Sequence, residues 1–431
     1  MELFDIGPWV AFSALAVTAA VFIAAIVYFV RSAPPTTITI SSGPDGSNYF
    51  KIATKYAKIL ERNRVKVNVL TSKGSVENLS RLLDPKANVD VGLVGTGPAT
   101  PDADKLVSLG SVSNQPVLVF YRGKSLTLLS ELKGKKVSVG PEGSGTRAIA
   151  LAILALNDIK PGEVEKTELL DFDADDAEAA LKAKRIDAAF VMGESATPQI
   201  MKSLLRAGDI HLYSFKQANG YSRKLEYLHV LELPEGTINL GQNLPDRDVT
   251  LLGTTVEVIA DHDLHPALVD LLVEAETEVH SRPGLFQRRG DFPAPTEHTI
   301  KMSDEAVMYF KSGKGYLYRN FPFWLASLLS RILVVFVPVL LVTIPALRSI
   351  PAFFRWIARL RIRRRYRELR ILEQRYLTEK DAERRESIRR EFDRIDENLH
   401  RMKVRASFAD QYYGLREHID YVRRVLDRRP V

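Results

Sequence analysis

The segment Leu129–Ala155, LSELKGKKVSVGPEGSGTRAIALAILA, combines a charged turn, a short apolar run and a glycine-rich loop. Val137–Val139 is typical of a short buried strand, whereas the apolar pattern after Thr146 is too long for another strand. The segment therefore predicts a strand, a tight loop over Gly140–Gly145 and the start of a helix. Ser144 or Thr146 is the expected cap of that helix.

Such a junction directs unpaired backbone N–H groups, two hydroxyls and the positive end of a helix dipole toward one point. That point is favourable for an anion, most simply a carboxylate. An ordinary βα turn whose glycines only satisfy backbone geometry fits the same residues. The loop is not a Walker phosphate loop, because no Gly-Lys-Ser/Thr closes it, and it lacks the dinucleotide spacing G-x-G-x-x-G.

The same alternation of strand and polar loop occurs three times upstream. The predicted strands are 37–41, 65–70 and 89–94, and they end at the loops 43–49, 71–78 and 95–98. Helical patterns follow the first two loops, at 49–60 and 79–83. This alternation predicts an α/β fold with a parallel sheet and right-handed crossovers. Ligands of such sheets bind at the carboxyl ends of the strands, where these loops meet.

Further elements are expected downstream of these three units. The predicted strands are 116–121, 164–172, 186–192, 211–215, 227–233 and 250–259, and the predicted helices are 175–183, 265–279 and 297–310. The last strand is expected to carry the chain back to the first unit. The segments between the strand 116–121 and this last strand, together with Leu129–Ala155, are expected to form a second α/β unit.

Two apolar runs are long enough to cross a bilayer of about 30 Å. The first, Trp9–Val30, has no charged residue, and the second, Phe323–Leu347, is interrupted only by Arg331. Met1–Gly7 contains two acidic residues and no basic one, which is untypical of a cleaved signal peptide. The first run is therefore predicted to be a retained transmembrane anchor.

The basic charge of the chain belongs to its C-terminal part. Residues 347–431 contain 24 Lys or Arg against 14 Asp or Glu, an excess of ten, while the whole chain is +7, so residues 1–346 carry about −3. Since positive residues flank the cytoplasmic ends of spans, the tail and both termini are predicted in the cytoplasm. Residues 36–320 then lie in the periplasm of a bacterial cell, bound to its inner membrane.

Two patterns describe the tail. Arg348–Arg370 is rich in arginine with interleaved aromatics, and its position beside a span favours anionic lipid headgroups over nucleic acid as its partner. Apolar residues then recur at spacings of 4, 3, 4 and 3 from Ile388 to Met402, and again from Leu415 to Leu426. These stripes predict charged, coiled-coil-like helices that pair with each other or, in a homo-oligomer, with another copy of the chain.

No catalytic constellation stands out, and the sequence predicts a protein that is not an enzyme and needs no cofactor. The chain has no cysteine, which excludes disulfides and thiolate metal sites. Ser144 is not part of a G-x-S-x-G elbow. Asp261–His265 contains residue types that bind metals, but it lies at a strand-to-helix transition where Asp commonly caps helices, so no metal site is predicted.

Four segments, taken together and in order, resemble the TAXI family of solute-binding proteins of tripartite ATP-independent periplasmic (TRAP) transporters. They are GPDGSNY at 43–49, GSVENL at 74–79, the LKGKKV strand with its GSGT loop, and IDAAF at 186–190. The resemblance extends from about Ile38 to Val279. It implies a type II periplasmic-binding fold, with two α/β lobes joined by crossing strands and a cleft for organic acids such as glutamate.

The resemblance also implies the residues of that cleft. The first loop would contribute Ser47, Asn48 and Tyr49, the second Gly74, Ser75 and Asn78, and the other lobe Ser144, Gly145 and Thr146, which would take the anionic group. Thr96 is the candidate after the third strand, where family members often have Gln or Asp. Another departure is Glu194, which would repel an anion if it faced the cleft. Family members are also free in the periplasm, without the second span and tail.

These observations predict four parts: an N-terminal transmembrane anchor (1–35), a periplasmic two-lobe domain (36–320), a second transmembrane helix (321–347) and a cytoplasmic helical tail (348–431). Lobe 1 is expected at about 36–120 and 250–320, and lobe 2 at about 121–249. The predicted function is capture of a small organic anion or amino acid for TRAP membrane subunits. A transmembrane ligand sensor or scaffold that signals through the tail is the alternative.

Overall fold

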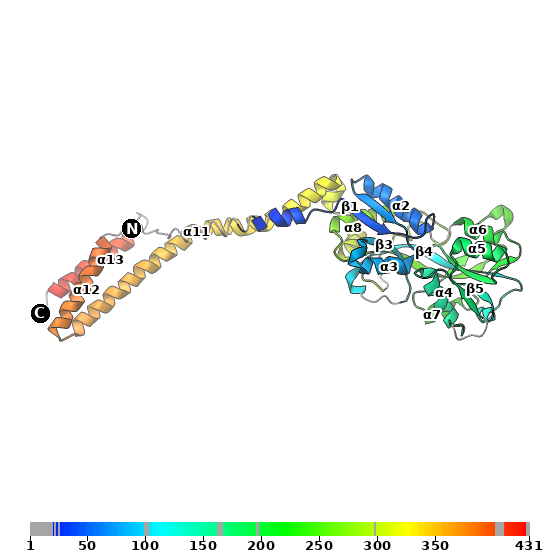
Figure 1. Cartoon of the computed structure of the whole chain (residues 1–431). Helices are drawn as coiled ribbons and strands as arrows, with labels where there is room; N and C mark the ends of the chain where they lie inside the picture. Colours follow the sequence, from blue (N-terminus) through cyan, green and yellow to red (C-terminus); the bar gives the residue numbers. More distant parts are fainter. Residues whose placement is uncertain are drawn as a thin grey trace. The chain divides into compact units, whose positions relative to one another are not determined.

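The computed structural model describes residues 20, 23, 24, 26–98, 103–161, 167–194, 198–296, 299–400 and 409–427 (Figure 1). The chain divides into two compact units. Residues 34–328 form one unit, called here the two-lobe domain, and residues 1–33 together with 329–431 form the other.

The described part of the two-lobe domain contains ten strands in one mixed sheet. Their order is β2-β1-β3-β10-β4-β7-β5-β6, with β8 paired to β4 and β9 paired to β10. The strands are β1 Thr37–Ser41, β2 Lys66–Leu70, β3 Val91–Gly95, β4 Leu106–Arg122, β5 Lys136–Ser138, β6 Glu168–Leu170, β7 Ala188–Met192, β8 Ile210–Leu212, β9 His229–Leu233 and β10 Val249–Asp261.

The two-lobe domain also contains helices, most of which cover the faces of this sheet. They are α2 Asn48–Glu61, α3 Ser75–Leu83, α4 Gly145–Ala155, α5 Ala174–Lys182, α6 Pro198–Leu205, α7 Ala218–Lys224, α8 Pro266–His280, α9 Asp304–Ser312 and α10 Tyr316–Asn320. Several begin at the caps that their sequences suggest. Ser47 accepts a hydrogen bond from the Phe50 N–H, and Ser144 rather than Thr146 caps α4 by accepting from the Arg147 N–H.

Two long antiparallel strands, β4 and β10, run through both lobes. In β10, Val256–Ala260 pairs with β3 of lobe 1, whereas Val249–Gly253 pairs with β9 of lobe 2. In β4, Val117–Tyr121 pairs with β7 of lobe 2. The expected two-lobe α/β architecture with crossing strands is therefore confirmed, and Figure 1 shows β4 between the two lobes.

The sheet differs from the expected parallel one because these crossing strands are antiparallel to their neighbours. Within each lobe the strands that precede α3 and α4 do pair in parallel, β1 with β2 and β5 with β6 and β7. The strand β4 begins at Leu106 rather than Pro116. Its first half, LVSLGSVSNQ, was missed because Ser, Gly and Asn are typical of loops, whereas here most of these residues are buried in the sheet.

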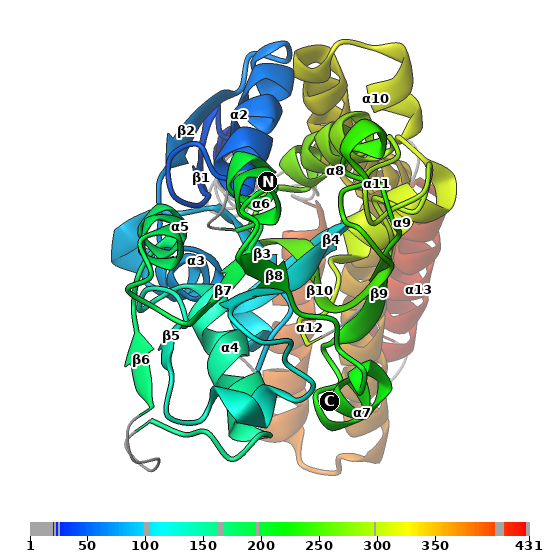
Figure 2. The same cartoon turned by 90° about the vertical axis from the view of Figure 1, so that its right-hand side faces the viewer.

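Each lobe has its own hydrophobic core. In lobe 1, Ile38 and Ile40 of β1 pack with α2 and α8. In lobe 2, successive residues of β7 face opposite sides, so that Phe190 packs with α4 and α7 and Val191 packs with α5 and α6. Figure 2 shows these two helix pairs on opposite sides of the lobe 2 strands. The expected apolar strands are thus buried on both faces.

The tail consists of α11 Phe323–Thr378, α12 Ala382–His400 and α13 Ala409–Asp427. One buried cluster joins all three helices; it includes Leu369, Tyr376, Phe392, Leu415, Ile419 and Val422. The buried Asp396 of α12 accepts a hydrogen bond from Arg423 of α13 at 2.7 Å. The sequence left open whether these helices pair with each other or with another copy of the chain. In the structure they pair with each other. Met402 lies outside the described residues, as does the side chain of Leu399.

The two predicted membrane spans stay predictions. Most of Trp9–Val30 lies outside the described residues. The second predicted span forms the first part of α11, and many side chains of that part are also outside the description. Among the residues that the structure describes, no helix has both the length and the apolar character needed to cross a membrane.

Candidate carboxylate site between the lobes

Two helices begin at the junction of the lobes. The helix α3 follows β2 in lobe 1, and α4 follows β5 and the glycine-rich loop in lobe 2. The loop after β7, in lobe 2, also reaches this point, with Glu194 as its last described residue. The carboxyl ends of parallel strands from both lobes therefore meet here, as expected for the ligand site of an α/β sheet.

The carboxylate of Glu194 lies between the first turns of these two helices. From lobe 1, the Ser75 N–H and hydroxyl donate to Glu194 Oε2 at 3.0 and 2.7 Å. From lobe 2, the Thr146 N–H and hydroxyl donate to Glu194 Oε1, the hydroxyl at 2.9 Å. Four donors thus converge on one carboxylate that is 0% exposed.

The electrostatics of this arrangement favour a negative charge. The first N–H groups of a helix have no partner within the helix, and the positive end of each helix dipole is directed at the carboxylate. Hydrogen bonds to a charged acceptor are about twice as strong as neutral ones. No ion pair to Glu194 is present among the described residues. The helix N-termini and the two hydroxyls therefore offset the cost of removing its carboxylate from water.

Two glycines make room for the carboxylate. A Cβ atom on Gly74 or on Gly145 would lie 2.7 Å from Glu194 Oε2, closer than real Cβ contacts come. Gly74 also has φ of +132°, a conformation that L side chains rarely adopt. We call Gly74, Ser75, Gly145, Thr146 and Glu194 the interlobe carboxylate site. A backbone hydrogen bond of 2.9 Å from the Glu77 N–H to the Gly143 carbonyl joins the lobes beside it.

Tyr49 supports the site from α2. Its hydroxyl donates to Gln115 Oε1 on the crossing strand β4 at 2.8 Å and lies 3.5 Å from the Ser75 hydroxyl. Burial, and to a smaller extent the charge of Glu194, raise the pKa of Tyr49 well above its usual value. Tyr49 therefore remains a protonated donor.

Two other residues that the resemblance implied, Asn78 and Thr96, make hydrogen bonds that do not involve Glu194. Asn78 donates from Nδ2 to the carbonyls of Ser42 and Leu93 at 2.6 and 2.7 Å, and its Oδ1 accepts from Ser41. The hydroxyl of Thr96 accepts from the Thr255 N–H at 3.0 Å. The same hydroxyl donates to the carbonyl of Tyr227 in lobe 2 at 3.5 Å. Asn78 therefore connects strands of lobe 1, whereas Thr96 also contacts the other lobe.

The remaining candidates are helix caps or lie at the edge of the junction. Ser47 and Ser144 cap α2 and α4, so their oxygens already accept from those helices. Asn48 is half-buried and lines a separate cavity of about 410 Å³ with Lys51 and Lys55. Gly74, Ser75, Gly145 and Thr146 are thus the predicted residues that meet at one carboxylate.

A small cavity of about 60 Å³ adjoins the interlobe carboxylate site. Its polar lining includes Gln115 and Thr254, which are 3% and 0% exposed. Gln115 Nε2 and Thr254 Oγ1 have no hydrogen-bond partner among the described residues. Glu257 also lines it, and burial raises the pKa of Glu257 to about 8. The volume is enough for a few water molecules, but not for an amino acid.

Sequence reasoning missed three residues of this junction. Gln115 and Thr254 lie in the crossing strands, not in the loops where ligand residues were sought. The sequence indicates Glu194 only as a residue that would repel an anion, whereas in the structure its carboxylate fills the position expected for the anion. The available signal was an acidic residue two positions after a buried strand, at the same edge of the sheet as the starts of α3 and α4.

No group of three metal-ligating side chains occurs within the part of the chain that the structure describes. In the segment Asp261–His265, the Nδ1 atom of His265 accepts a hydrogen bond from the Ala267 N–H at 3.1 Å and caps α8. The side chain of Asp261 accepts from the Asp263 N–H at 2.8 Å. Both residues serve the turn between β10 and α8.

Two α/β lobes joined by two crossing strands form a periplasmic-binding-protein-like fold. The sequence profile of the NMT1-like family matches residues 40–281, more than half of the chain. The chain therefore belongs to the NMT1-like family. No curated protein matches the sequence.

Similar solved structures include three binding proteins. The aliphatic sulphonate binding protein SsuA from Escherichia coli is 17% identical, with a TM-score of 0.34 over 56% of this chain and 69% of that one. An ancestral arginine-binding protein bound to arginine is 13% identical, with a TM-score of 0.37 over 57% and 93%. The alkanesulfonate-binding protein SsuA from Xanthomonas axonopodis pv. citri, bound to MOPS, is 17% identical, with a TM-score of 0.36 over 57% and 74%.

Proposed function

We propose that this protein is a membrane-anchored, extracytoplasmic solute-binding protein similar to the TAXI family. Its two-lobe domain captures a small carboxylate or an amino-acid-like ligand and presents it to a TRAP-type transporter. The observation that carries the proposal is the convergence of α3 and α4, from different lobes, on a single carboxylate group. Closure of two lobes on one ligand is a common mode of capture.

Membrane attachment is part of the proposal and rests on the sequence. The uncharged run Trp9–Val30 and the apolar run within residues 321–347 are the proposed spans, with residues 36–320 in the periplasm and both termini in the cytoplasm. The 56 residues of α11 form a helix about 84 Å long, enough for one bilayer crossing of about 30 Å and a cytoplasmic extension. The arginines of that extension would contact anionic lipids of the inner membrane.

A binding screen tests the capture function. The purified full-length chain, in detergent, is titrated with small organic acids and amino acids, and its melting is followed. A ligand at 100 times its Kd adds about 2.7 kcal/mol of stability. The double variant Ser75→Ala and Thr146→Val should lose the response, because the four donors become two. Thr237→Val changes an exposed hydroxyl in a lobe 2 loop and should keep it.

Two outcomes contradict the proposal. One is a panel in which no acid or amino acid raises the melting temperature of the wild type. The other is a response that the double variant retains in full, since the ligand would then bind elsewhere. Transport is tested separately, by solute uptake in cells that lack residues 36–320; persistent uptake removes the delivery role.

A second candidate is a transmembrane sensor or scaffold, and the tail favours it. Three helices with a common buried core form a folded unit of their own, for which solute delivery has no evident use. In this reading, occupancy of the interlobe site changes the arrangement of α11–α13. Crosslinking of single cysteines placed in the tail, with and without ligand, distinguishes the two roles. An unchanged crosslinking pattern counts against the sensor.

A further inference from the structure

The interlobe carboxylate site already contains a carboxylate, and that carboxylate is supplied by the chain itself. Glu194 follows β7 in lobe 2, while the Ser75 N–H and hydroxyl that bind its Oε2 belong to lobe 1. Its other oxygen binds Thr146 of its own lobe. The two oxygens of one side chain therefore connect the first turns of two helices in different lobes.

There is no room for a second carboxylate at this position. Glu194 is 0% exposed, and both Gly74 and Gly145 are too close to its Oε2 to carry even a methyl group. The adjoining cavity has a volume of about 60 Å³. A free acid can therefore reach the four donors only after the Glu194 side chain has left them.

We propose that Glu194 is an intramolecular ligand of this site: the lobes close on their own side chain, and a free carboxylate binds only in exchange for it. The inference rests on the proposed function in taking this junction as the solute site. It adds that the wild-type domain is closed in the absence of solute, and that Glu194 competes with every incoming carboxylate.

The buried polar atoms beside the site fit such an exchange. Gln115 and Thr254 line the cavity, and their Nε2 and Oγ1 atoms have no hydrogen-bond partner among the described residues. A buried polar atom without a partner destabilises the folded state. A solute larger than the Glu194 side chain would extend past the four donors into this cavity and bond to these two atoms, which gives it an advantage over Glu194.

Chemical rescue tests the proposal. Glu194→Ala removes the atoms of one CH₂–COO⁻ group, so that acetate has the size and charge of the missing part. The full-length variant, in detergent, should melt below the wild type, and acetate should restore its melting temperature saturably. Acetamide, which has the same shape but no charge, should not. Acetate should bind the variant at least about tenfold more tightly than the wild type. In the variant, acetate restores the hydrogen bonds to a charged group that the substitution removed, whereas in the wild type Glu194 already makes them.

Two further variants complete the design. Glu142→Ala removes an exposed carboxylate from the same glycine-rich loop and should behave as wild type. If Glu194→Ala does not fold, Glu194→Gln decides, because it keeps the shape but turns one acceptor into a donor that faces other donors. The proposal predicts a lower melting temperature for Glu194→Gln than for Glu142→Gln. Equal melting of these two variants overturns it.

The outcomes separate this inference from the proposed function. Acetate rescue of Glu194→Ala, in a protein whose wild type binds no acid of the panel, supports the internal ligand and removes the capture function. Capture of a panel acid by the wild type, with equal affinity in Glu194→Ala and no acetate rescue, supports capture and overturns the internal ligand.

Discussion

Ser75 and Glu194 are 119 positions apart in the sequence and belong to different lobes, yet the Ser75 hydroxyl donates to Glu194 Oε2 at 2.7 Å. The bond joins the first turn of α3 to the loop after β7. It couples the closed arrangement of the lobes to the charge of one side chain.

Ser75→Ala should therefore destabilise the two-lobe domain. The variant loses a hydrogen bond to a charged acceptor, so we expect its free energy of unfolding to fall by about 1.5–3 kcal/mol. In a Glu194→Ala background the same substitution should cost far less, because its acceptor is absent. Urea unfolding of the four proteins of this cycle measures the coupling. Ser222→Ala, which removes a half-buried hydroxyl that bonds to the Asn219 carbonyl within α7, is the control. Additive free energies in the cycle would contradict the coupling.

Gly145→Ala provides a test in which two effects have opposite signs. Alanine is favoured over glycine in a helix by up to about 1 kcal/mol. At position 145, however, the added Cβ would lie 2.7 Å from Glu194 Oε2, so we expect a net loss of about 1–3 kcal/mol. Removing Glu194 should relieve most of this loss. Gly220→Ala in α7, where the Cβ enters open space, should be neutral or stabilising.

Asn78 is predicted to be structural, not ligand-binding. Asn78→Asp replaces the amide that donates to the Ser42 and Leu93 carbonyls with a buried carboxylate that cannot donate. We expect a loss of about 3 kcal/mol or more in the free energy of unfolding. The acetate affinity of a folded Glu194→Ala/Asn78→Asp protein should stay that of Glu194→Ala. Asn88→Asp, at an exposed position, is the matched control. A loss of acetate binding in the Asn78 variant alone would show that Asn78 contributes to ligand binding.

Glu257 should make the stability of the domain depend on pH. Burial raises its pKa from 4.5 to about 8 in the folded protein, so the folded state favours the protonated form. Its contribution to stability is fully present below about pH 4.5 and is lost as the pH rises toward 8. Between pH 5 and 8, the unfolding free energy of Glu257→Gln should therefore fall by a few kcal/mol less than that of the wild type. Identical slopes for wild type and variant would show that Glu257 does not titrate in this range.

The sequence predicted the local junctions of this fold better than its crossing strands. Leu129–Ala155 contains all the determinants of β5, the loop and α4, since apolar alternation, glycines and a capping serine act within a few residues. The first half of β4 has no such local signal. Its Ser108 and Ser111 are buried, and its Ser113 and Asn114 half-buried, where it pairs with β10, more than a hundred positions away. Long-range pairing decided the conformation there.

The same distinction applies to the site. Gly74, Ser75, Gly145 and Thr146 could be found because helix starts and glycine loops are local features. The role of Glu194 could not be predicted from its neighbours in the sequence. Its negative charge is unfavourable if an anion binds beside it, but favourable if Glu194 itself occupies the anion position. Which of the two holds depends on side chains from both lobes.

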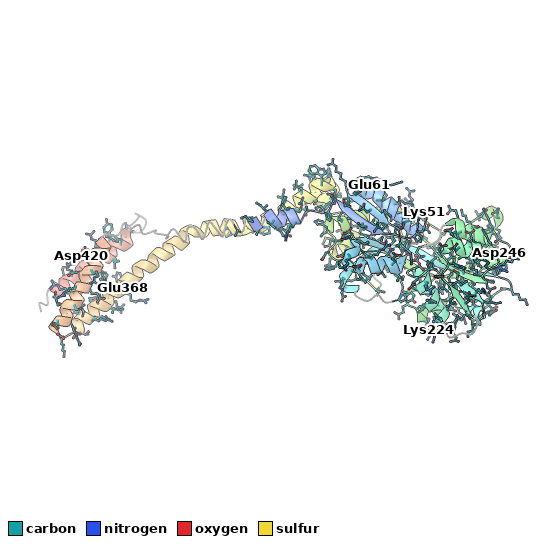
Figure 3. The ribbon with its side chains drawn as sticks, viewed as in Figure 1. Lys51, Glu61, Lys224, Asp246, Glu368 and Asp420 are labelled. Carbon is teal, nitrogen blue, oxygen red and sulfur yellow. The ribbon has the colours of Figure 1, made fainter. Side chains whose placement is uncertain are left out.

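The most direct test of the account measures the distance between the lobes without any solute. The chain has no cysteine, so spin labels can be placed at Glu61→Cys in α2 and Lys224→Cys in α7, both exposed (Figure 3). Pulsed dipolar spectroscopy on the full-length protein should give one narrow distance, which broadens and lengthens in Glu194→Ala and returns with acetate. A broad distribution in the wild type that is unchanged by Glu194→Ala would contradict the claim that Glu194 holds the lobes together.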